Sequence, residues 1–546
     1  MGASLSTIRQ RTARLRAYTR TNVAQPFTWW QRGLIYQVYP RSFLDSNADG
    51  TGDLPGITQK LEYLQWLGVD AIWISPIYPS PMVDFGYDVA NYTDVDPIFG
   101  TLADFDELLK QAHAKDIRVI LDYVPNHTSD QHPWFRESRA SRTNAKRDWY
   151  IWRDTPNNWL SVFGGSAWTF DEATRQYYYH AYLKEQPDLN WRNPAVQDAM
   201  YDVLRFWFDK GVDGFRIDAL RQVMKHQDLP DNPPNPNWQP GRDPYQSLLL
   251  TYSADQPELM DVVHRFREVA EEYKDRVLIG ELWLSIQRLV AYYGENGRGL
   301  HLPFNFHLIL TPWQAHQISG LIDTYEQALP PDAWPNWVLG NHDRSRIATR
   351  VGAAQARVAA MLLLTLRGTP TLYNGDEIGM HDVPIPPELV QDPFEHNVPG
   401  IGAGRDPERT PLQWNDFPNA GFTAAKEPWL PLADDYRSCN VAAQQSDPRS
   451  MLSLHRALIY LRRKMPALSV GTYMHVYTDD DLLVYERAVA QERVRVALNL
   501  SHRERQLEWR APRGKVLLST HLDRDGEVGP RLDLRPDEGV VALLDQ

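Results

Sequence analysis

The chain has 546 residues, 57 Lys and Arg against 70 Asp and Glu, and a formal net charge of −13. Its basic residues are scattered rather than clustered, which argues against a nucleic-acid partner, and no apolar run reaches the roughly 18 residues of a membrane span. The single cysteine, Cys439, excludes an internal disulfide and fits a cytoplasmic protein.

Residues 1–28 form a leader ahead of the first predicted strand. Arginines are spaced there through Ser, Thr and Ala, and the segment lacks the apolar core of about 7–15 residues that a secretory signal needs. We therefore expect a leader that is not a targeting peptide.

Short β-branched segments alternate with amphipathic helical segments through most of the chain. The predicted strands cover 34–39, 71–75, 119–124, 214–218, 277–281, 302–307, 337–341 and 371–374, and the clearest helical patterns cover 102–114, 196–208, 259–273 and 354–366. Eight such units predict an α/β fold, a (β/α)₈ TIM barrel, whose active site lies at the C-terminal ends of the strands.

Three segments do not fit the barrel repeat. Residues 128–193 are too long for a loop and rich in Trp and Tyr, which predicts an inserted subdomain after strand 3, beside the site. Residues 381–446, rich in Pro and Gly, predict an extra loop subdomain after strand 8. From residue 467 to 546, alternating segments predict a C-terminal antiparallel β-sandwich domain, which leaves 29–127 and 194–466 for the catalytic barrel.

Polar side chains gather at the ends of the third, fourth, fifth and seventh predicted strands. They are Asp122, Asn126 and His127, then Arg216 and Asp218, then Glu281, and finally Asn341, His342 and Asp343. A barrel brings these ends together over one mouth. Several carboxylates without a cysteine nucleophile favour glycoside cleavage, which needs one carboxylate as nucleophile and one carboxylic acid as proton donor. The histidines are too isolated for a metal hydrolase, and the sequence has no glycine-rich phosphate-binding motif.

The same segments carry a family resemblance. DYVPNH (122–127), GFRIDA (214–219), GELW (280–283) and GNHD (340–343) occur in order, together with IYQVYPRSF (35–43), GYDVANY (86–92), QPDLNW (186–191) and RTPLQW (409–414). From about residue 29 to its end, the chain resembles the α-amylase superfamily, glycoside hydrolase family 13, and more closely its α-glucosidase and oligo-1,6-glucosidase branch.

The resemblance implies the roles of four residues in the chemistry. Asp218 would be the nucleophile, Glu281 the general acid/base, and Asp343 the third carboxylate, which binds sugar hydroxyls. Arg216 would orient Asp218 and lower its pKa, whereas burial and neighbouring carboxylates should raise the pKa of Glu281.

The resemblance also implies a closed sugar-binding pocket. His127 and His342 would bind hydroxyls of the glucose being cleaved, and Tyr87 would stack under its ring. In relatives of this branch an Asp and an Arg pair across the pocket and bind the terminal glucose. Asp88 and Arg409 match those positions, with Arg405 as a second contact.

The segment DSNADGTGD (45–53) predicts a metal site. It offers oxygen ligands at Asp45, Asn47, Asp49 and Asp53 and a backbone carbonyl at Thr51, as in the first part of an EF-hand loop. Gly56 replaces the bidentate Glu of that loop. Relatives hold one structural Ca²⁺ or Mg²⁺ in a similar loop, so we favour this ion over a plain turn and expect no organic cofactor.

These observations predict a retaining, exo-acting α-glucosidase that acts on small oligosaccharides or disaccharides, as a monomer or homodimer. Ala219 follows the nucleophile, where relatives with Val tend towards α-1,6 bonds and those with Thr or Ala towards α-1,4 bonds, so we expect an α-1,4 preference. The loop at 228–244 should narrow the mouth. Two alternatives remain: a glucosyltransferase or sugar isomerase of the same family, of the sucrose isomerase or trehalose synthase type, and a catalytically inactive binding subunit.

Overall fold

The computed structural model describes residues 27–545, and its centre is an eight-stranded parallel sheet curved into a nearly closed barrel. The strands are β1 (Ile35–Val38), β2 (Ala71–Ile74), β3 (Arg118–Tyr123), β7 (Gly214–Ile217), β8 (Val277–Glu281), β9 (Leu302–Phe304), β10 (Asn336–Val338) and β11 (Thr369–Tyr373). They pair in the order β10-β11-β1-β2-β3-β7-β8-β9. The Asn305 backbone N–H donates to the Asn336 side chain across the remaining gap, at 2.8 Å. The predicted TIM barrel is confirmed.

The barrel strands are short apolar runs because both of their faces are covered. All four residues of β1, β2 and β7 are buried, as expected for a parallel sheet with side chains inside and helices outside. Two predicted strands were too long at their C-terminal ends. The segment at 302–307 leaves the sheet after Phe304, and the segment at 337–341 leaves it after Val338.

Helices surround the barrel, and the four predicted helical patterns are all present. α5 (Leu102–Ala114) begins at a capping box between Thr101 and Asp104, and α7 (Pro194–Lys210) ends at left-handed Gly211. The other helices of the barrel and its loops are α2 (Trp29–Arg32), α3 (Leu54–Gln59), α4 (Leu61–Leu67), α8 (Leu259–Glu271), α9 (Ile286–Leu289), α10 (His307–Leu310), α11 (Ala315–Ala328), α12 (Ile347–Thr365), α13 (Pro393–Asn397), α14 (Val441–Ser446), α15 (Met451–Lys464) and α16 (Pro466–Val470).

Among the described residues, α12 alone has the length and composition of a membrane span. It has 19 residues and a mean hydropathy of 1.3. Its apolar side chains from Val358 to Leu364 are buried, and the helix packs against α15 and against strands of the C-terminal domain. These contacts are those of a core helix between two domains.

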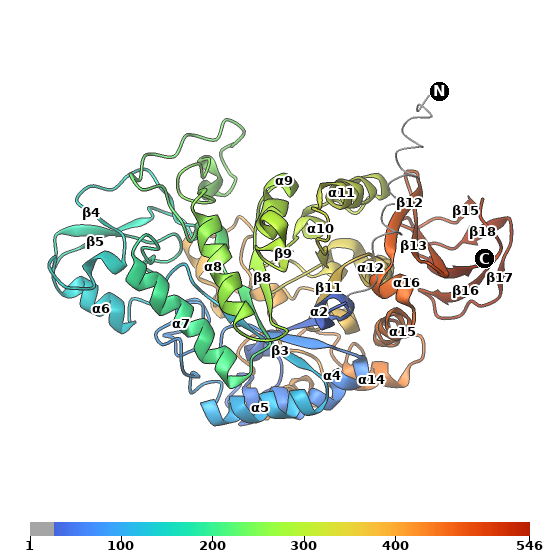
Figure 1. Cartoon of the computed structure of the whole chain (residues 1–546). Coiled ribbons are helices and arrows are strands. Elements are labelled where there is room, and N and C mark those ends of the chain that lie inside the picture. The colour runs from blue at the N-terminus through green and yellow to red at the C-terminus, as the bar shows by residue number, and fades with distance from the viewer. Residues whose placement is uncertain (1–26, 546) are drawn as a thin grey trace, which may run out of the picture.

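The inserted subdomain contains α6 (Pro133–Ala140) and a small antiparallel sheet of β4 (Trp152–Arg153), β6 (Gln176–Tyr179) and β5 (Trp168–Asp171), in that order. Trp159, Trp168 and Tyr179 form its own aromatic cluster. In Figure 1 this subdomain lies on the left of the barrel, and the C-terminal domain, in red, lies on the right.

The C-terminal domain has the predicted antiparallel architecture. Its strands are β12 (Thr472–Thr478), β13 (Leu482–Val489), β14 (Glu492–Asn499), β15 (Arg505–Glu508), β16 (Gly514–Ser519), β17 (Glu527–Val528), β18 (Arg531–Leu534) and β19 (Gly539–Leu544). Six strands form one sheet, and β15 pairs with β18 in a second. Alternate residues of β13 explain the packing: Leu483 and Tyr485 join the main core with the barrel helices, whereas Leu482 and Val484 join the core of the domain itself.

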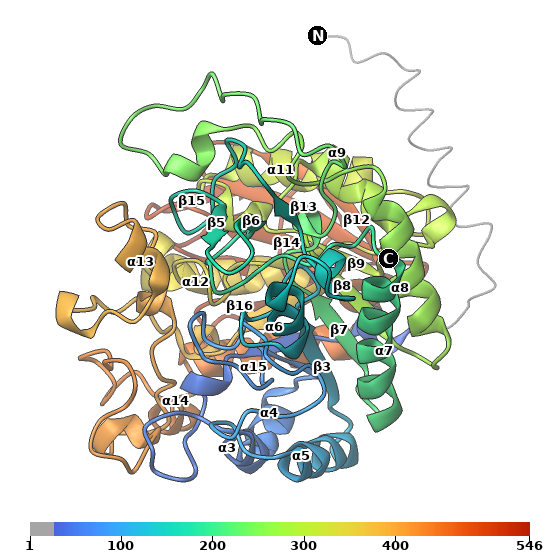
Figure 2. The same ribbon diagram turned by 90° about the vertical axis from the view of Figure 1, so that its left-hand side faces the viewer.

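Three excursions surround one end of the barrel. Figure 2 looks at this end, with the inserted subdomain towards the viewer. A long loop that includes residues 235–250, here called the green loop, projects above it. The segment after β11 that carries α13, here called the orange segment, lies to the left. The predicted leader, apart from Phe27 and Thr28, falls outside the described residues.

Candidate active site

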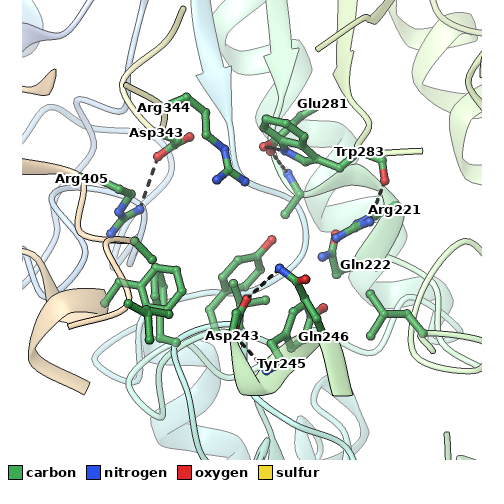
Figure 3. Close-up of a pocket in the computed structure, with 18 of the residues that line it drawn as sticks. Arg221, Gln222, Asp243, Tyr245, Gln246, Glu281, Trp283, Asp343, Arg344 and Arg405 are labelled. Carbon is green, nitrogen blue, oxygen red and sulfur yellow. Dashed lines mark hydrogen bonds and ion pairs between the residues drawn. The ribbon is translucent and has the colours of Figure 1, made fainter. Parts of the chain in front are cut away.

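A cavity of about 930 Å³ opens between the strand ends and the three excursions, a volume within the range of small-molecule sites. The barrel contributes Tyr87, Asp218, Glu281, His342 and Asp343 to its wall. The inserted subdomain contributes Val162, Phe163 and Tyr182, the green loop contributes residues from Asn235 to Leu250, and the orange segment contributes Phe394 and residues up to Arg405. The predicted site residues of four strands therefore meet in one cavity (Figure 3).

Arg216 links three carboxylates at the floor of this cavity. Its Nη1 lies 2.8 Å from Asp122 and 2.6 Å from Asp218, and its Nη2 lies 3.0 Å from Glu281. The register of the sheet explains the arrangement, because Asp122 of β3 pairs directly with Arg216 of β7 and Glu281 ends the next strand. Arg216 is 1% exposed, so these ion pairs form away from water.

Two further donors hold Glu281. The backbone N–H of Ala219 donates to one carboxylate oxygen and the indole Nε1–H of Trp283 donates to the other, each at 2.8 Å. Ala219 reaches Glu281 from a left-handed backbone conformation with φ of +47°, which costs about 1 kcal/mol or more for a residue with a Cβ. The sequence does not predict either contact, because no rule relates the spacing of these residues to a contact with Glu281.

Opposing effects set the pKa of Asp218. Burial raises the pKa of Asp218 well above its usual value, and the charges of Glu281, Asp122 and Asp343 raise it further. Arg216 lowers this pKa, as expected, but burial and the three carboxylates outweigh it. Burial likewise raises the pKa of Asp122 to about 6. A cluster of carboxylates around one guanidinium therefore holds a proton more readily than isolated carboxyl groups do.

Asp343 stays ionised. Burial alone would raise its pKa, but the positive charges around it hold the pKa well below its usual range. Arg409 lies 2.9 Å away and Arg405 3.4 Å away. His342 contributes no charge near neutral pH, because burial lowers its pKa to about 3. The two guanidinium groups are thus the partners that keep Asp343 charged.

The other expected sugar-binding residues also line the cavity and are fixed by one another. The Tyr87 hydroxyl lies 2.8 Å from His342 Nε2 and donates to Asp122 at 3.0 Å. His127 Nε2 lies 3.1 Å from the Tyr87 carbonyl oxygen, and burial lowers its pKa to about 4. Gln186, from the QPDLNW segment, lies 3.2 Å from the same His127 nitrogen. The inserted subdomain is therefore part of the site.

The expected pair of Asp88 and Arg409 does not form. Asp88 turns back into its own loop and accepts the backbone N–H groups of Val83 and Asp84, while Arg409 donates to the His342 carbonyl and to Asp343. The pair that closes the cavity is Asp84 with Arg405, at 2.8 Å.

Arg405 forms ion pairs with several carboxylates at this end of the cavity. Besides Asp84 it contacts Asp392 at 2.6 Å and Asp343 at 3.4 Å, and it lies over the ring of Phe163. Gln186 donates to the other oxygen of Asp84. The segment DFGYD (84–88) contains two aspartates, Asp84 and Asp88, and either could pair with an arginine. Their positions in the sequence do not show which of them faces the cavity.

The predicted metal loop is held together by its own backbone. Asp45 accepts the N–H groups of Asn47, Ala48 and Gly50, Asn47 accepts that of Asp49, and Asp49 accepts that of Thr51. Asp53 instead caps α3 through Gly56 and binds Ser46. The oxygen donors suit Ca²⁺ or Mg²⁺, but the described residues hold no group of three or more acidic, His or Cys side chains arranged for a metal. The fit is therefore partial, and none of the loop residues lines the cavity.

The rim of the cavity contains groups that motif analysis did not identify. The loop expected to narrow the mouth does line it, through Asn235 and through residues from Gly241 onward to Leu250, beyond the predicted end at 244. Arg221 and Trp283 lie on the side of Glu281, and Arg344 reaches between Asp343 and Glu281 (Figure 3).

Comparison with known proteins gives a consistent result. The sequence model of a family described as alpha amylase, catalytic domain, matches residues 37–471. A probable alpha-glucosidase of Rhizobium meliloti is 42% identical over 497 residues, covering 87% of this chain and 89% of the relative. An oligo-1,6-glucosidase of Parageobacillus thermoglucosidasius is 38% identical over 562 residues, covering 94% and 98%. The crystal structure of an alpha-glucosyl transfer enzyme, XgtA, superposes with a TM-score of 0.91 at 41% identity, over 95% of this chain and 100% of that one.

Proposed function

The chain belongs to the α-amylase family and is a glycoside hydrolase, and from this premise we propose that it is a retaining, exo-acting α-glucosidase. Its substrates would be short α-glucosides, cleaved at the non-reducing end. The observation that carries the proposal is the single guanidinium of Arg216 that binds both Asp218 and Glu281.

The two carboxylates divide the chemistry between them. An Asp218 oxygen attacks the anomeric carbon while the bond to the leaving oxygen breaks, and Glu281 delivers its proton to that oxygen. In the second step Glu281 takes a proton from water, whose oxygen attacks the anomeric carbon and releases Asp218. Retaining enzymes keep their carboxyl groups about 5–5.5 Å apart, against about 6.5–9.5 Å in inverting enzymes. Attachment to one guanidinium favours the shorter separation.

Asp343 and Arg216 stabilise the charges that develop during the reaction. Asp343 is ionised and lies beside the sugar position, where a negative charge favours the oxocarbenium-like transition state and accepts sugar hydroxyls. Arg216 keeps Asp218 in line and offsets its charge when the covalent bond breaks.

Exo action follows from the closed end of the cavity. Asp84 and Arg405 are joined by a charge-assisted hydrogen bond, and both line the cavity wall. They would bind hydroxyls of the terminal glucose and leave no path for a chain that continues beyond it. An extended polymer would then enter only by its non-reducing end.

Linkage preference and transfer are set on the other side of Glu281. Ala219 carries only a methyl group beside the bond to be cut, which supports a preference for α-1,4 over α-1,6 linkages. The similarity to an alpha-glucosyl transfer enzyme favours some transfer of glucose to sugar acceptors as well as to water. We also propose that the loop at 45–53 binds one structural Ca²⁺ or Mg²⁺, with no part in the chemistry.

The test is a substrate panel with the products followed over time. Maltose, isomaltose, sucrose, trehalose and maltotriose are incubated with the enzyme, and proton NMR records which anomer of glucose appears first. We expect α-glucose from sucrose and from the non-reducing end of maltotriose, because each releases a single glucose, with transfer products at high substrate concentration. First release of β-glucose from sucrose or maltotriose would overturn the retaining assignment, and release of maltose from internal bonds of longer chains would overturn exo action.

A further inference from the structure

Three arginines on the rim of the cavity have no acidic partner in the part of the chain that the structure describes. Arg221, Arg242 and Arg344 all line the cavity, and within residues 27–545 none of them lies within ion-pair distance of a carboxylate. Arg221 donates to the carbonyl oxygen of Trp283 at 2.7 Å, and its Nε is buried without a hydrogen-bond partner in the described structure. Figure 3 shows Arg344 extending into the cavity between Asp343 and Glu281.

The arginines at the floor of the same cavity, by contrast, have acidic partners. Arg216, Arg405 and Arg409 each contact at least one carboxylate at 3.0 Å or less. In a chain with a net charge of −13, carboxylates are in excess. The three rim guanidinium groups differ from those of the floor in having no carboxylate partner among the described residues, and the floor chemistry does not use them.

Two of the rim arginines, Arg221 and Arg344, lie on the side where the leaving group must sit. A general acid has to be within hydrogen-bond reach of the oxygen that it protonates, so the group attached to that oxygen lies next to Glu281. Trp283 donates to Glu281, Arg344 lies over the Trp283 ring at 4.9 Å from its centroid, and Arg221 binds the Trp283 backbone. Both guanidinium groups are thus attached through one residue to the general acid.

The charge balance of this region favours an anion. Arg221 is half-buried, whereas Arg242 and Arg344 are exposed. A guanidinium without a counter-charge is free to form short, directional and often bidentate hydrogen bonds with an anionic ligand. Among the described residues the rim has one acidic side chain, Asp243, which accepts the backbone N–H of Tyr245 and the side-chain N–H of Gln246 rather than pairing with an arginine. The rim therefore carries three positive charges and one negative charge.

We propose that the leaving-group side of the active site recognises an anionic group, so that the preferred substrates or acceptors are α-glucosides whose second unit carries a carboxylate or a phosphate. This inference rests on the proposed glucosidase function and specifies its substrate class. Glucose itself binds on the floor among Asp84, Arg405 and Asp343, and the anion of the second unit binds Arg344 and Arg221. Arg242 adds charge at the outer edge.

The experiment compares neutral and anionic substrates of matched shape. Maltitol is paired with maltobionate, because both have an open-chain second unit and only the second carries a carboxylate, and trehalose is paired with trehalose 6-phosphate. We expect kcat/KM to be at least tenfold higher for an anionic member than for its neutral counterpart, equivalent to about 1.4 kcal/mol. The preference should shrink as salt is raised, because the rim is open to solvent. The carboxylate and phosphate arms distinguish the two sources of the anion.

Variants identify the residues. Arg344→Gln and Arg221→Gln should each reduce the anionic-to-neutral ratio to below about threefold, whereas Arg298→Gln, an exposed arginine outside the cavity, should leave the ratio unchanged. A ratio near or below one for both pairs in the wild type would overturn the inference, as would a preference that survives both rim variants.

Failure of the proposed function has a different signature. If neutral disaccharides are cleaved without an anionic preference, the glucosidase assignment stands and the rim inference fails. If no substrate is cleaved, the glucosidase assignment fails, and calorimetry of maltobionate and maltitol binding to Glu281→Gln decides the inference independently. Tighter binding of maltobionate supports it, and equal or weaker binding overturns it.

Discussion

The charge pair that closes the cavity can be tested with a single isosteric substitution. Asp84→Asn keeps the shape of the side chain but removes its charge, so that Arg405 keeps Asp392 and Asp343 as partners. Asp84 is 4% exposed, and its contact with a sugar hydroxyl would be made out of water. A hydrogen bond to a charged group contributes about 1.5–3 kcal/mol, which corresponds to a loss of about 10- to 150-fold in kcat/KM.

The assay measures initial rates on maltose and on an activated aryl α-glucoside. Asp84 would hold the glucose that is common to both substrates, so the fold-loss should be the same for the two. A loss confined to maltose would place Asp84 on the leaving-group side and contradict the closed-end argument.

Asp392→Asn is the matched control, because Asp392 contacts the same arginine but does not line the cavity. Arg405 holds the pKa of Asp392 down at about 2 against the effect of burial, so removing the charge should cost about 2 kcal/mol of stability at neutral pH and lower Tm. Its kcat/KM should change less than about fivefold. Equal kinetic losses in the two variants would show that Asp84 acts only by positioning Arg405, and the reasoning would be refuted.

Four further outcomes follow from the site. Glu281→Gln should lose about 10²–10⁴-fold in kcat on maltose but far less on an aryl glucoside whose leaving group needs no proton; equal losses would contradict the acid assignment. Removal of Ca²⁺ by a chelator should lower Tm while kcat stays constant at a temperature where the protein is folded, and an unchanged Tm would exclude a bound ion in the loop at 45–53. Ala219→Val should shift the ratio of kcat/KM values towards isomaltose and lower Tm, because a β-branched residue is strained at φ of +47°; an unchanged ratio would remove Ala219 as a determinant. The raised pKa of Asp218 means that the folded state binds this proton more tightly than the unfolded chain does, so the wild type loses stability as pH rises from about 4 through the raised pKa. Asp218→Asn should therefore melt above the wild type at pH 8, with a difference that vanishes near pH 4, and a lower Tm at pH 8 would contradict the charge balance at the floor.

The barrel was predictable because its signals are local. A strand buried on both faces must be a short apolar run, and β2 and β8 begin and end within a residue of the predicted segments. Residues that end such strands necessarily meet at one mouth of the barrel, so the sequence alone predicts that Asp218 and Glu281 lie together. Strand ends were less predictable where the chain bends early, as after Phe304.

Other features of the site depend on how loops and charges are arranged in space, which the spacing of residues along the sequence does not show. Asp84 and Asp88 are equivalent as letters, and only the loop conformation decides that Asp88 accepts backbone N–H groups while Asp84 faces Arg405. The direction of the pKa shift of Asp218 likewise results from burial and three carboxylates acting against one arginine. A sequence shows that Arg216 is two residues away, but not how many negative charges converge on the same point.

This division has a consequence for substrate choice. The chemistry resides on strand ends, where Arg216 and its carboxylates are fixed by the register of the sheet, whereas Arg221, Arg242 and Arg344 lie on connections outside the strands. Loop residues can be exchanged without moving the barrel frame. Substitution at the rim should therefore change which second unit is accepted while the double displacement at the floor continues, and the anionic-to-neutral ratio of the rim variants measures that separation directly.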